Sequence, residues 1–147
     1  MDEFVVRKEI RISAEPEQVW DALTNPAKTK KYFFNCEVFS DWEVGSAIRF
    51  IGTVLLIKKI EMNGIILEIE PNRLLKYSLT NADDSDDPAN FSTVTDTLSY
   101  ENGETILRIT DNVGQGKGAE ERYRRSEKGW DTILKGLKDV VNDSKAP

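Results

Sequence analysis

The chain has 147 residues, of which 39% are hydrophobic and 31% are charged, a composition typical of one globular domain. Its net charge is −6, it contains no histidine, and Cys36 is its one cysteine. These counts exclude an intrachain disulfide, a cysteine-rich zinc site and catalysis by Ser-His-Asp or Cys-His groups, and the acidic balance argues against nucleic acid as a partner. We therefore expect a single domain over residues 1–147, without a metal or a cofactor.

The N-terminus carries no recognisable signal for export. Asp2 and Glu3 stand where a secretory signal would be basic, and no apolar run approaches the roughly 20 residues needed to cross a bilayer. A lone cysteine also suits a reducing compartment. We expect a cytoplasmic protein that does not insert into a membrane.

The first third of the chain predicts a strand followed by two short helices. Residues 3–12 alternate between apolar and charged side chains, which is typical of a half-buried strand. The period changes at Pro16, which suits the first turn of a helix and is followed by an apolar stripe. This helix is predicted to end near Asn25, and a further turn or two of helix is expected within residues 27–34.

The middle of the chain predicts an antiparallel meander, because its apolar runs are separated by turns too short for a parallel crossover. The predicted strands are 37–40, 46–55, 58–70, 73–81, 91–101 and 104–113. Asn102-Gly103 predicts a hairpin turn. Asn63-Gly64 is open to two interpretations, a second hairpin or one long strand with a bulge at Gly64, and we favour the bulge.

The last part of the chain predicts one long amphipathic helix. Residues 114–118 are rich in glycine and are expected to form a connector, and apolar side chains then recur at helical spacing over about 118–143. Before them, residues 83–88 form a polar segment that we expect to be a mobile loop. Its four aspartates lack the glycine and glutamate positions of a calcium-binding loop.

Several motifs resemble one family. The segment SAEPEQVWDALTNP at 13–26 resembles the opening motif of the proteins related to the activator of Hsp90 ATPase, a branch of the START-like helix-grip superfamily. Residues 41–45 resemble that family's glycine turn, residues 64–71 its strand that ends in proline, and Gly129 with Trp130 its final helix. The resemblance covers nearly the whole chain.

The resemblance implies an α+β helix-grip fold, also called Bet v 1-like. In this fold a curved antiparallel sheet of about six to seven strands wraps around a long C-terminal helix, with two short helices after the first strand. The resemblance further implies a cavity between that helix and the sheet, and hence the binding of a small hydrophobic ligand. Two alternatives stay open: an interaction protein that acts on an Hsp90-like chaperone, and a cavity enzyme of the polyketide cyclase kind.

Candidate ligand contacts are the large apolar side chains expected to face this cavity, because small-molecule pockets are mostly apolar and methionine adapts to irregular shapes. They are Phe33, Phe34, Phe50, Met62, Tyr77, Trp130, Leu134 and Leu137. The alternative is that these residues fill an ordinary core. No residue is assigned a catalytic or a metal-binding role, and we expect a binding protein rather than an enzyme.

Two sets of charged residues have further possible roles. Four cations lie in the first half of the last predicted helix, where the helix dipole disfavours positive charge: Arg122, Arg124, Arg125 and Lys128. They either form an exposed face with neighbouring glutamates or meet an acidic partner. Four carboxylates lie on predicted strands, and any that is buried would have a shifted pKa: Asp96, Glu101, Glu104 and Asp111.

Overall fold

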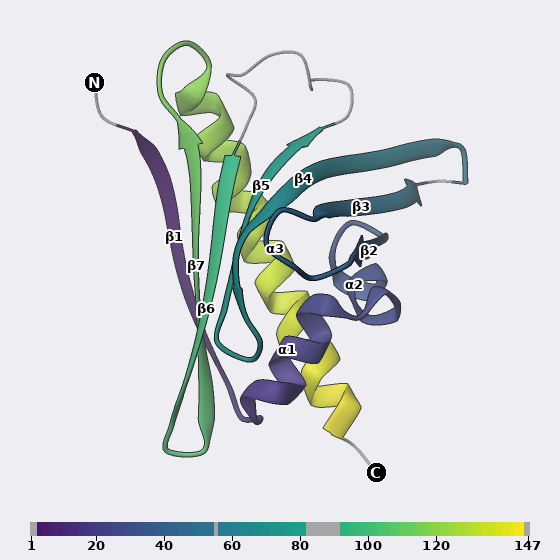
Figure 1. Ribbon diagram of the computed structural model, residues 1–147, viewed down its shortest axis with the longest axis vertical. Coiled ribbons are helices and arrows are strands. Elements are labelled where there is room, and N and C mark those ends of the chain that lie inside the picture. Colours follow the sequence, from purple (N-terminus) through teal and green to yellow (C-terminus); the bar gives the residue numbers. More distant parts are fainter. Residues whose placement is uncertain (1–2, 55, 82–91, 146–147) are drawn as a thin grey trace.

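The computed structural model describes residues 3–54, 56–81 and 92–145, and within these ranges the chain forms one seven-stranded sheet and three helices (Figure 1). In chain order the elements are β1 (Phe4–Ile12), α1 (Pro16–Thr24), α2 (Pro26–Tyr32), β2 (Cys36–Ser40), β3 (Ala47–Val54), β4 (Lys58–Glu70), β5 (Leu74–Asn81), β6 (Ser92–Glu101), β7 (Glu104–Gly114) and α3 (Ala119–Lys145). The predicted α+β helix-grip fold is confirmed. The predicted loop 83–88 lies outside the described residues.

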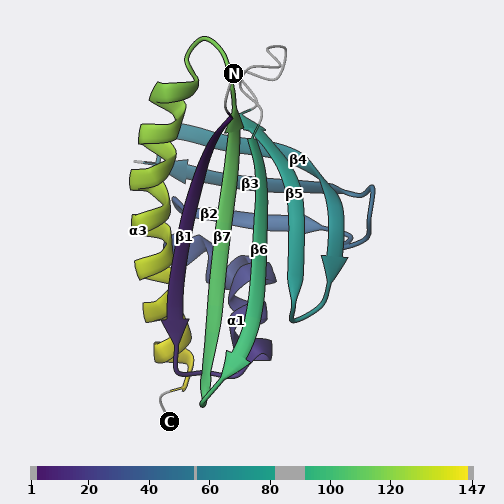
Figure 2. The same cartoon turned by 90° about the vertical axis from the view of Figure 1, so that its left-hand side faces the viewer.

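The strands pair in the order β1-β7-β6-β5-β4-β3-β2, and every pair is antiparallel. The sheet is strongly curved, so that β2 and β3 run across the direction of β1, β7 and β6, while α3 lies along the inner side (Figure 2). The predicted hairpin at Asn102-Gly103 is confirmed, with φ angles of 52° and 80° that suit asparagine and glycine.

The strand β4 runs unbroken through Gly64, so the prediction of one long strand is confirmed. The predicted place of the bulge is wrong, because the register with β5 shifts between Ile66 and Glu68 and not at Gly64. Gly64 is needed for a different reason. A Cβ atom at this position would lie 1.6 Å from the carbonyl oxygen of Ser78, so only a glycine lets β4 and β5 approach this closely.

The two short helices are joined end to end and tied together. Pro16 begins α1 and Asn25 follows its last residue. The Asn25 side chain also caps α2, where its Oδ1 accepts a hydrogen bond from the backbone N–H of Ala27 at 3.0 Å. The hydroxyl of Tyr32 then donates to the Ala22 carbonyl at 2.7 Å, and this bond fixes α2 against α1.

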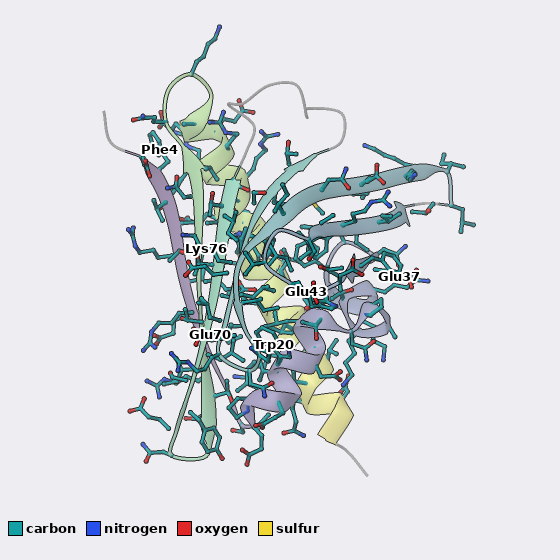
Figure 3. The ribbon with its side chains drawn as sticks, viewed as in Figure 1. Phe4, Trp20, Glu37, Glu43, Glu70 and Lys76 are labelled. Atoms are coloured by element: carbon teal, nitrogen blue, oxygen red, sulfur yellow. The ribbon has the colours of Figure 1, made fainter. Side chains whose placement is uncertain are left out.

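The helix α3 begins and ends within two residues of its predicted bounds and covers the concave face of the sheet. At its start the ring of Tyr123 contacts that of Phe4, labelled in Figure 3, with centroids 5.9 Å apart. In its second half Leu137 and Val141 are fully buried. Gly136 lies so close to α2 that a Cβ atom there would be 2.7 Å from the Cβ atom of Tyr32.

We predict opposite effects for two glycine-to-alanine substitutions in α3. Alanine is favoured over glycine inside a helix by about 1 kcal/mol. At Gly129 the added methyl group would lie 3.7 Å from Phe34, an ordinary contact, so Gly129→Ala should raise the unfolding free energy by up to that amount. At Gly136 the methyl group would meet Tyr32, so Gly136→Ala should lower it by about 1–3 kcal/mol. Urea unfolding measures both, and equal stability of the two variants would contradict the close contact between α2 and α3.

Candidate functional site

A cavity of about 280 Å³ lies between the first half of α3 and the sheet, near the end of β5 and the start of β6. One wall is apolar and largely aromatic, and the other carries charged and hydroxyl side chains. The residues that line it are Phe33, Phe34, Met62, Leu79, Thr80, Ser92, Asp111, Val113, Arg122, Arg125, Ser126, Gly129, Trp130 and Ile133. The cavity is therefore amphipathic and has room for a molecule of one or two rings.

The aromatic wall is built where α2 ends. The ring of Phe33 stacks on that of Phe50, with centroids 4.5 Å apart and planes 17° from parallel. The same ring meets Trp130 edge-on at 6.1 Å and Phe34 edge-on at 5.9 Å. The chain turns here through left-handed backbone angles at Phe34 and Asn35, with φ of 49° and 61°. These contacts hold the rings in one arrangement, so the wall is rigid.

A second, much smaller void of about 20 Å³ lies deeper between α3 and the sheet, with room for about one water molecule. The structure divides the eight predicted ligand contacts between these two spaces. Phe34 and Met62 line the larger cavity alone, whereas Phe33 and Trp130 line both and separate them. The remaining four line only the small void: Phe50, Tyr77, Leu134 and Leu137.

Asp111 supplies a buried carboxylate to the larger cavity. Its Oδ2 atom accepts hydrogen bonds from Trp130 Nε1 at 2.9 Å and from the hydroxyl of Ser126. Its Oδ1 atom is buried and has no hydrogen-bond partner among the described residues. The sequence contained a signal for this position, because Asp111 follows Ile109 and precedes Val113 at period two, which places all three on one face of β7.

Asp96 lies on the neighbouring strand β6 and lines the small void. Burial raises the pKa of its carboxyl from the ordinary 3.8 to about 8, and the negative charge of Asp111 adds to the rise. Burial also raises the pKa of Tyr32 and of Tyr77 well above 10.0, with a further contribution from the charge of Asp96. Asp96 is therefore mostly neutral at pH 7, so its carboxyl group does not add a second negative charge to the interior.

The cations at the start of α3 have separate roles. The guanidinium of Arg122 donates to the Val113 carbonyl at 2.9 Å and to the Lys117 carbonyl at 3.3 Å, which fastens the connector after β7 to the helix. Arg124 pairs with Glu120 one turn earlier, with nitrogen and oxygen 2.6 Å apart. Arg125 is exposed and lines the mouth of the cavity.

The hydroxyl side chains at the cavity were missed by the sequence analysis. Ser126 precedes Trp130 by four residues, so a helix places both on one face, and this spacing was the available signal. Thr80 and Ser92 gave no signal, because their place at the cavity depends on the pairing of β5 with β6, in which Leu79 lies opposite Ser92. In the part of the chain that the structure describes, no three acidic or cysteine side chains are grouped as metal ligands. None of the described helices has the length and apolar character needed to cross a bilayer.

Comparison with protein families matches residues 13–142 to the family described as Activator of Hsp90 ATPase homolog 1-like protein. No curated protein matches the chain. Among solved structures, protein ChR145 from Cytophaga hutchinsonii is 31% identical, with a TM-score of 0.78 over 98% of both chains. Protein MLL2253 from Mesorhizobium loti is 25% identical, with a TM-score of 0.78 over 97% of this chain and 99% of that one.

A third structure, the Aha1 dimer from Colwellia psychrerythraea, is 20% identical and has a TM-score of 0.72. The match covers 97% of this chain and 98% of that one. At this level of identity the likeness shows a shared fold only. All three structures agree with the present one over nearly the full length of both chains.

We predict that Asp96 makes the protein less stable as the pH rises. Between pH 3.8 and about pH 8 the folded state holds a proton on Asp96 that the unfolded state has lost, so the stabilisation present below pH 3.8 is lost by about pH 8. The slope is up to about 1.4 kcal/mol per pH unit. Asp96→Asn removes this titration, so its advantage over the wild type should grow up to about pH 8 and then stay constant.

Urea unfolding of both proteins at several pH values measures this difference. Asp139→Asn on the exposed side of α3 is the matched control, and it should show no such trend. A difference between Asp96→Asn and the wild type that does not change with pH would contradict the assignment.

Proposed function

We propose that this chain, which belongs to the family of Activator of Hsp90 ATPase homolog 1-like proteins, binds a small and largely apolar molecule in the cavity between α3 and the sheet. The observation that carries the proposal is the cavity of about 280 Å³ with its rigid aromatic wall. Ligand pockets are commonly about 300–1,000 Å³, mostly apolar, with a few polar groups that fix orientation. A ligand of one or two rings suits this volume.

Two of the six α3 residues that line the cavity have small side chains, and they leave space beside the larger ones. In its first half the helix faces the sheet with Ser126 and Gly129. In its second half the corresponding side chains are Leu134 and Leu137, which are buried against the core. A single helix therefore fills the concave sheet at one end and leaves it open at the other. Both ends of α3 are fixed, so the cavity is a permanent feature of the folded state.

A binding role fits the chemistry of the lining better than a catalytic one. With no histidine in the chain, proton transfer would depend on carboxylates. Asp111 is held by two hydrogen bonds from α3, and Asp96 faces the smaller void. The polar groups are thus placed to orient a bound molecule rather than to exchange protons with solvent.

A second candidate function is contact with a chaperone of the Hsp90 type, which the family description favours. Exposed apolar side chains that do not line the cavity are available for such a contact. Phe39 is 47% exposed and lines a groove together with Trp42, and Val44, two residues further along the chain, is 67% exposed. Stimulation of Hsp90 ATPase activity by the purified chain would support this function, and no stimulation at high micromolar protein would count against it.

We predict that naphthalene and octanoic acid bind in the cavity of the wild-type protein. Each should shift the amide signals of Phe34, Met62 and Trp130 together in a nuclear magnetic resonance titration. Each should also stabilise the protein by mass action, by about 2.7 kcal/mol at a hundred times the Kd. If neither compound shifts these signals at its solubility limit, the result would contradict the proposed function.

A cavity-filling variant locates the binding. Leu79 lines the cavity and is partly buried, so the larger side chain of Leu79→Trp should occupy the space. The apparent affinity obtained from the amide shifts should then fall at least about tenfold. Leu67→Trp is the matched control, because Leu67 is 40% exposed and does not line the cavity. Equal binding by the folded Leu79→Trp variant and the control would place the ligand elsewhere.

A further inference from the structure

We propose that the cavity binds a monoanion, an apolar molecule that carries one carboxylate, and that the guanidinium of Arg125 binds this carboxylate at the mouth of the cavity. The inference rests on the proposed function, since it assumes that the cavity holds a small molecule. It adds the chemical class of that molecule and the residue that recognises it.

The first step concerns the charge of the lining. Two arginines of α3, Arg122 and Arg125, line the cavity, and the lining residues include one carboxylate, that of Asp111. The cavity therefore has an excess of one positive charge, although the net charge of the chain is −6. A ligand with one negative charge would balance this excess, whereas a phosphate monoester, with a charge of about −2, would exceed it.

The second step shows that the carboxylate of the cavity is engaged elsewhere. Asp111 is 6% exposed, and its Oδ2 atom accepts hydrogen bonds from Trp130 Nε1 and from the hydroxyl of Ser126. Within the described residues no ion pair joins an aspartate or a glutamate to Arg122 or to Arg125. The acid of the lining thus serves donors on α3, and both guanidinium groups lack an anionic partner in the described part of the chain.

The third step separates the roles of the two arginines. Arg122 donates to the carbonyls of Val113 and Lys117, which hold its guanidinium in place without neutralising its charge. Arg125 is exposed and makes no hydrogen bond or ion pair to another described residue. A free guanidinium matches the two oxygens of a carboxylate with a pair of parallel hydrogen bonds. Arg125 is therefore the group that can bind the anion, and Arg122 adds a fixed attractive charge.

The fourth step concerns the orientation of the ligand. The rings of Phe33, Phe34 and Trp130 form the aromatic wall, which suits the apolar body of the molecule. A carboxylate placed at Arg125 keeps part of its water, so the ion pair avoids the high cost of taking a charge into the interior. The cavity thus favours an anion over an uncharged molecule of the same shape, and it disfavours a cation.

The test uses three naphthalene derivatives of similar size with the wild-type protein at neutral pH. They are 2-naphthoate, which is an anion, 2-naphthamide, which is uncharged and has nearly the same shape, and 2-naphthylmethylamine, which is a cation. At an ionic strength of about 0.01 M we expect the naphthoate to bind about fivefold tighter than the amide, as for one ion pair in contact with solvent. We expect the amine to bind most weakly. At about 1 M salt the ratio should approach one, because charges are then screened beyond about 3 Å.

A pair of variants tests the residue. Arg125→Gln removes the charge and the planar fork, so the preference for the naphthoate over the amide should fall to about equal. Arg124→Gln is the matched control, because it makes the same change of charge at the next residue of α3. Arg124 is also exposed, pairs with Glu120 and does not line the cavity, so its variant should keep the ratio of the wild type.

The outcomes separate the two proposals. If the naphthoate and the amide bind the wild type equally well at low salt, the anionic class is overturned while the ligand-binding function stands. If Arg124→Gln lowers the ratio as much as Arg125→Gln, the role of Arg125 is overturned, because the preference then reflects the general charge of the helix. If none of the three compounds shifts the amide signals of Phe34, Met62 and Trp130, the proposed function itself fails.

Discussion

The close contact between Gly136 on α3 and Tyr32 on α2 sets the position of the long helix, and the rest of the interior depends on it. Tyr32 is itself fixed by its hydrogen bond to Ala22, so the three helices are joined at one end of the molecule. At the other end Arg122 ties α3 to the carbonyl of Val113 at the end of β7. Held at both ends, the helix cannot sink into the curved sheet where its side chains are small.

The interior contains two buried carboxyl groups with different surroundings. Asp96 on β6 has a pKa raised to about 8, chiefly by burial, and is mostly neutral at pH 7. Asp111 on β7 accepts hydrogen bonds from two donors on α3, and its negative charge contributes to the raised pKa of Asp96. Neutralising one member of a buried pair lowers the cost of keeping the other charged. The deep void and the larger cavity therefore have different chemical characters. Among the described residues, three side chains line both spaces: Phe33, Trp130 and Ile133.

Local patterns predicted the elements of the fold well. Alternation over residues 3–12, the turn signal at Asn102-Gly103 and the helical spacing of Trp130 are each set by a few neighbouring residues, and the structure confirms all three. The motif at 13–26 predicted the family, which the match over residues 13–142 confirms.

The site was less accessible from the sequence, because it depends on distances between segments far apart in the chain. The predicted bulge was misplaced because Gly64 is required by the close approach of Ser78 on β5, and not by an irregularity of β4 at that position. Likewise the residues Ile133 and Leu134 are neighbours in the sequence, yet only the first reaches the larger cavity. That difference reflects the rotation of α3, which its packing against α2 determines.

The pairing of β1 with β7 has a consequence for how the binding site forms during folding. Val6 on β1 lies opposite Asp111 on β7, so this strand pair joins residues more than a hundred positions apart in the chain. Closing such a long loop is entropically costly, and contacts of this range form late. A growing chain on the ribosome therefore makes α3 after every strand of the sheet. The cavity is thus absent until α3 has been made, and a ligand stabilises the fold only after that point.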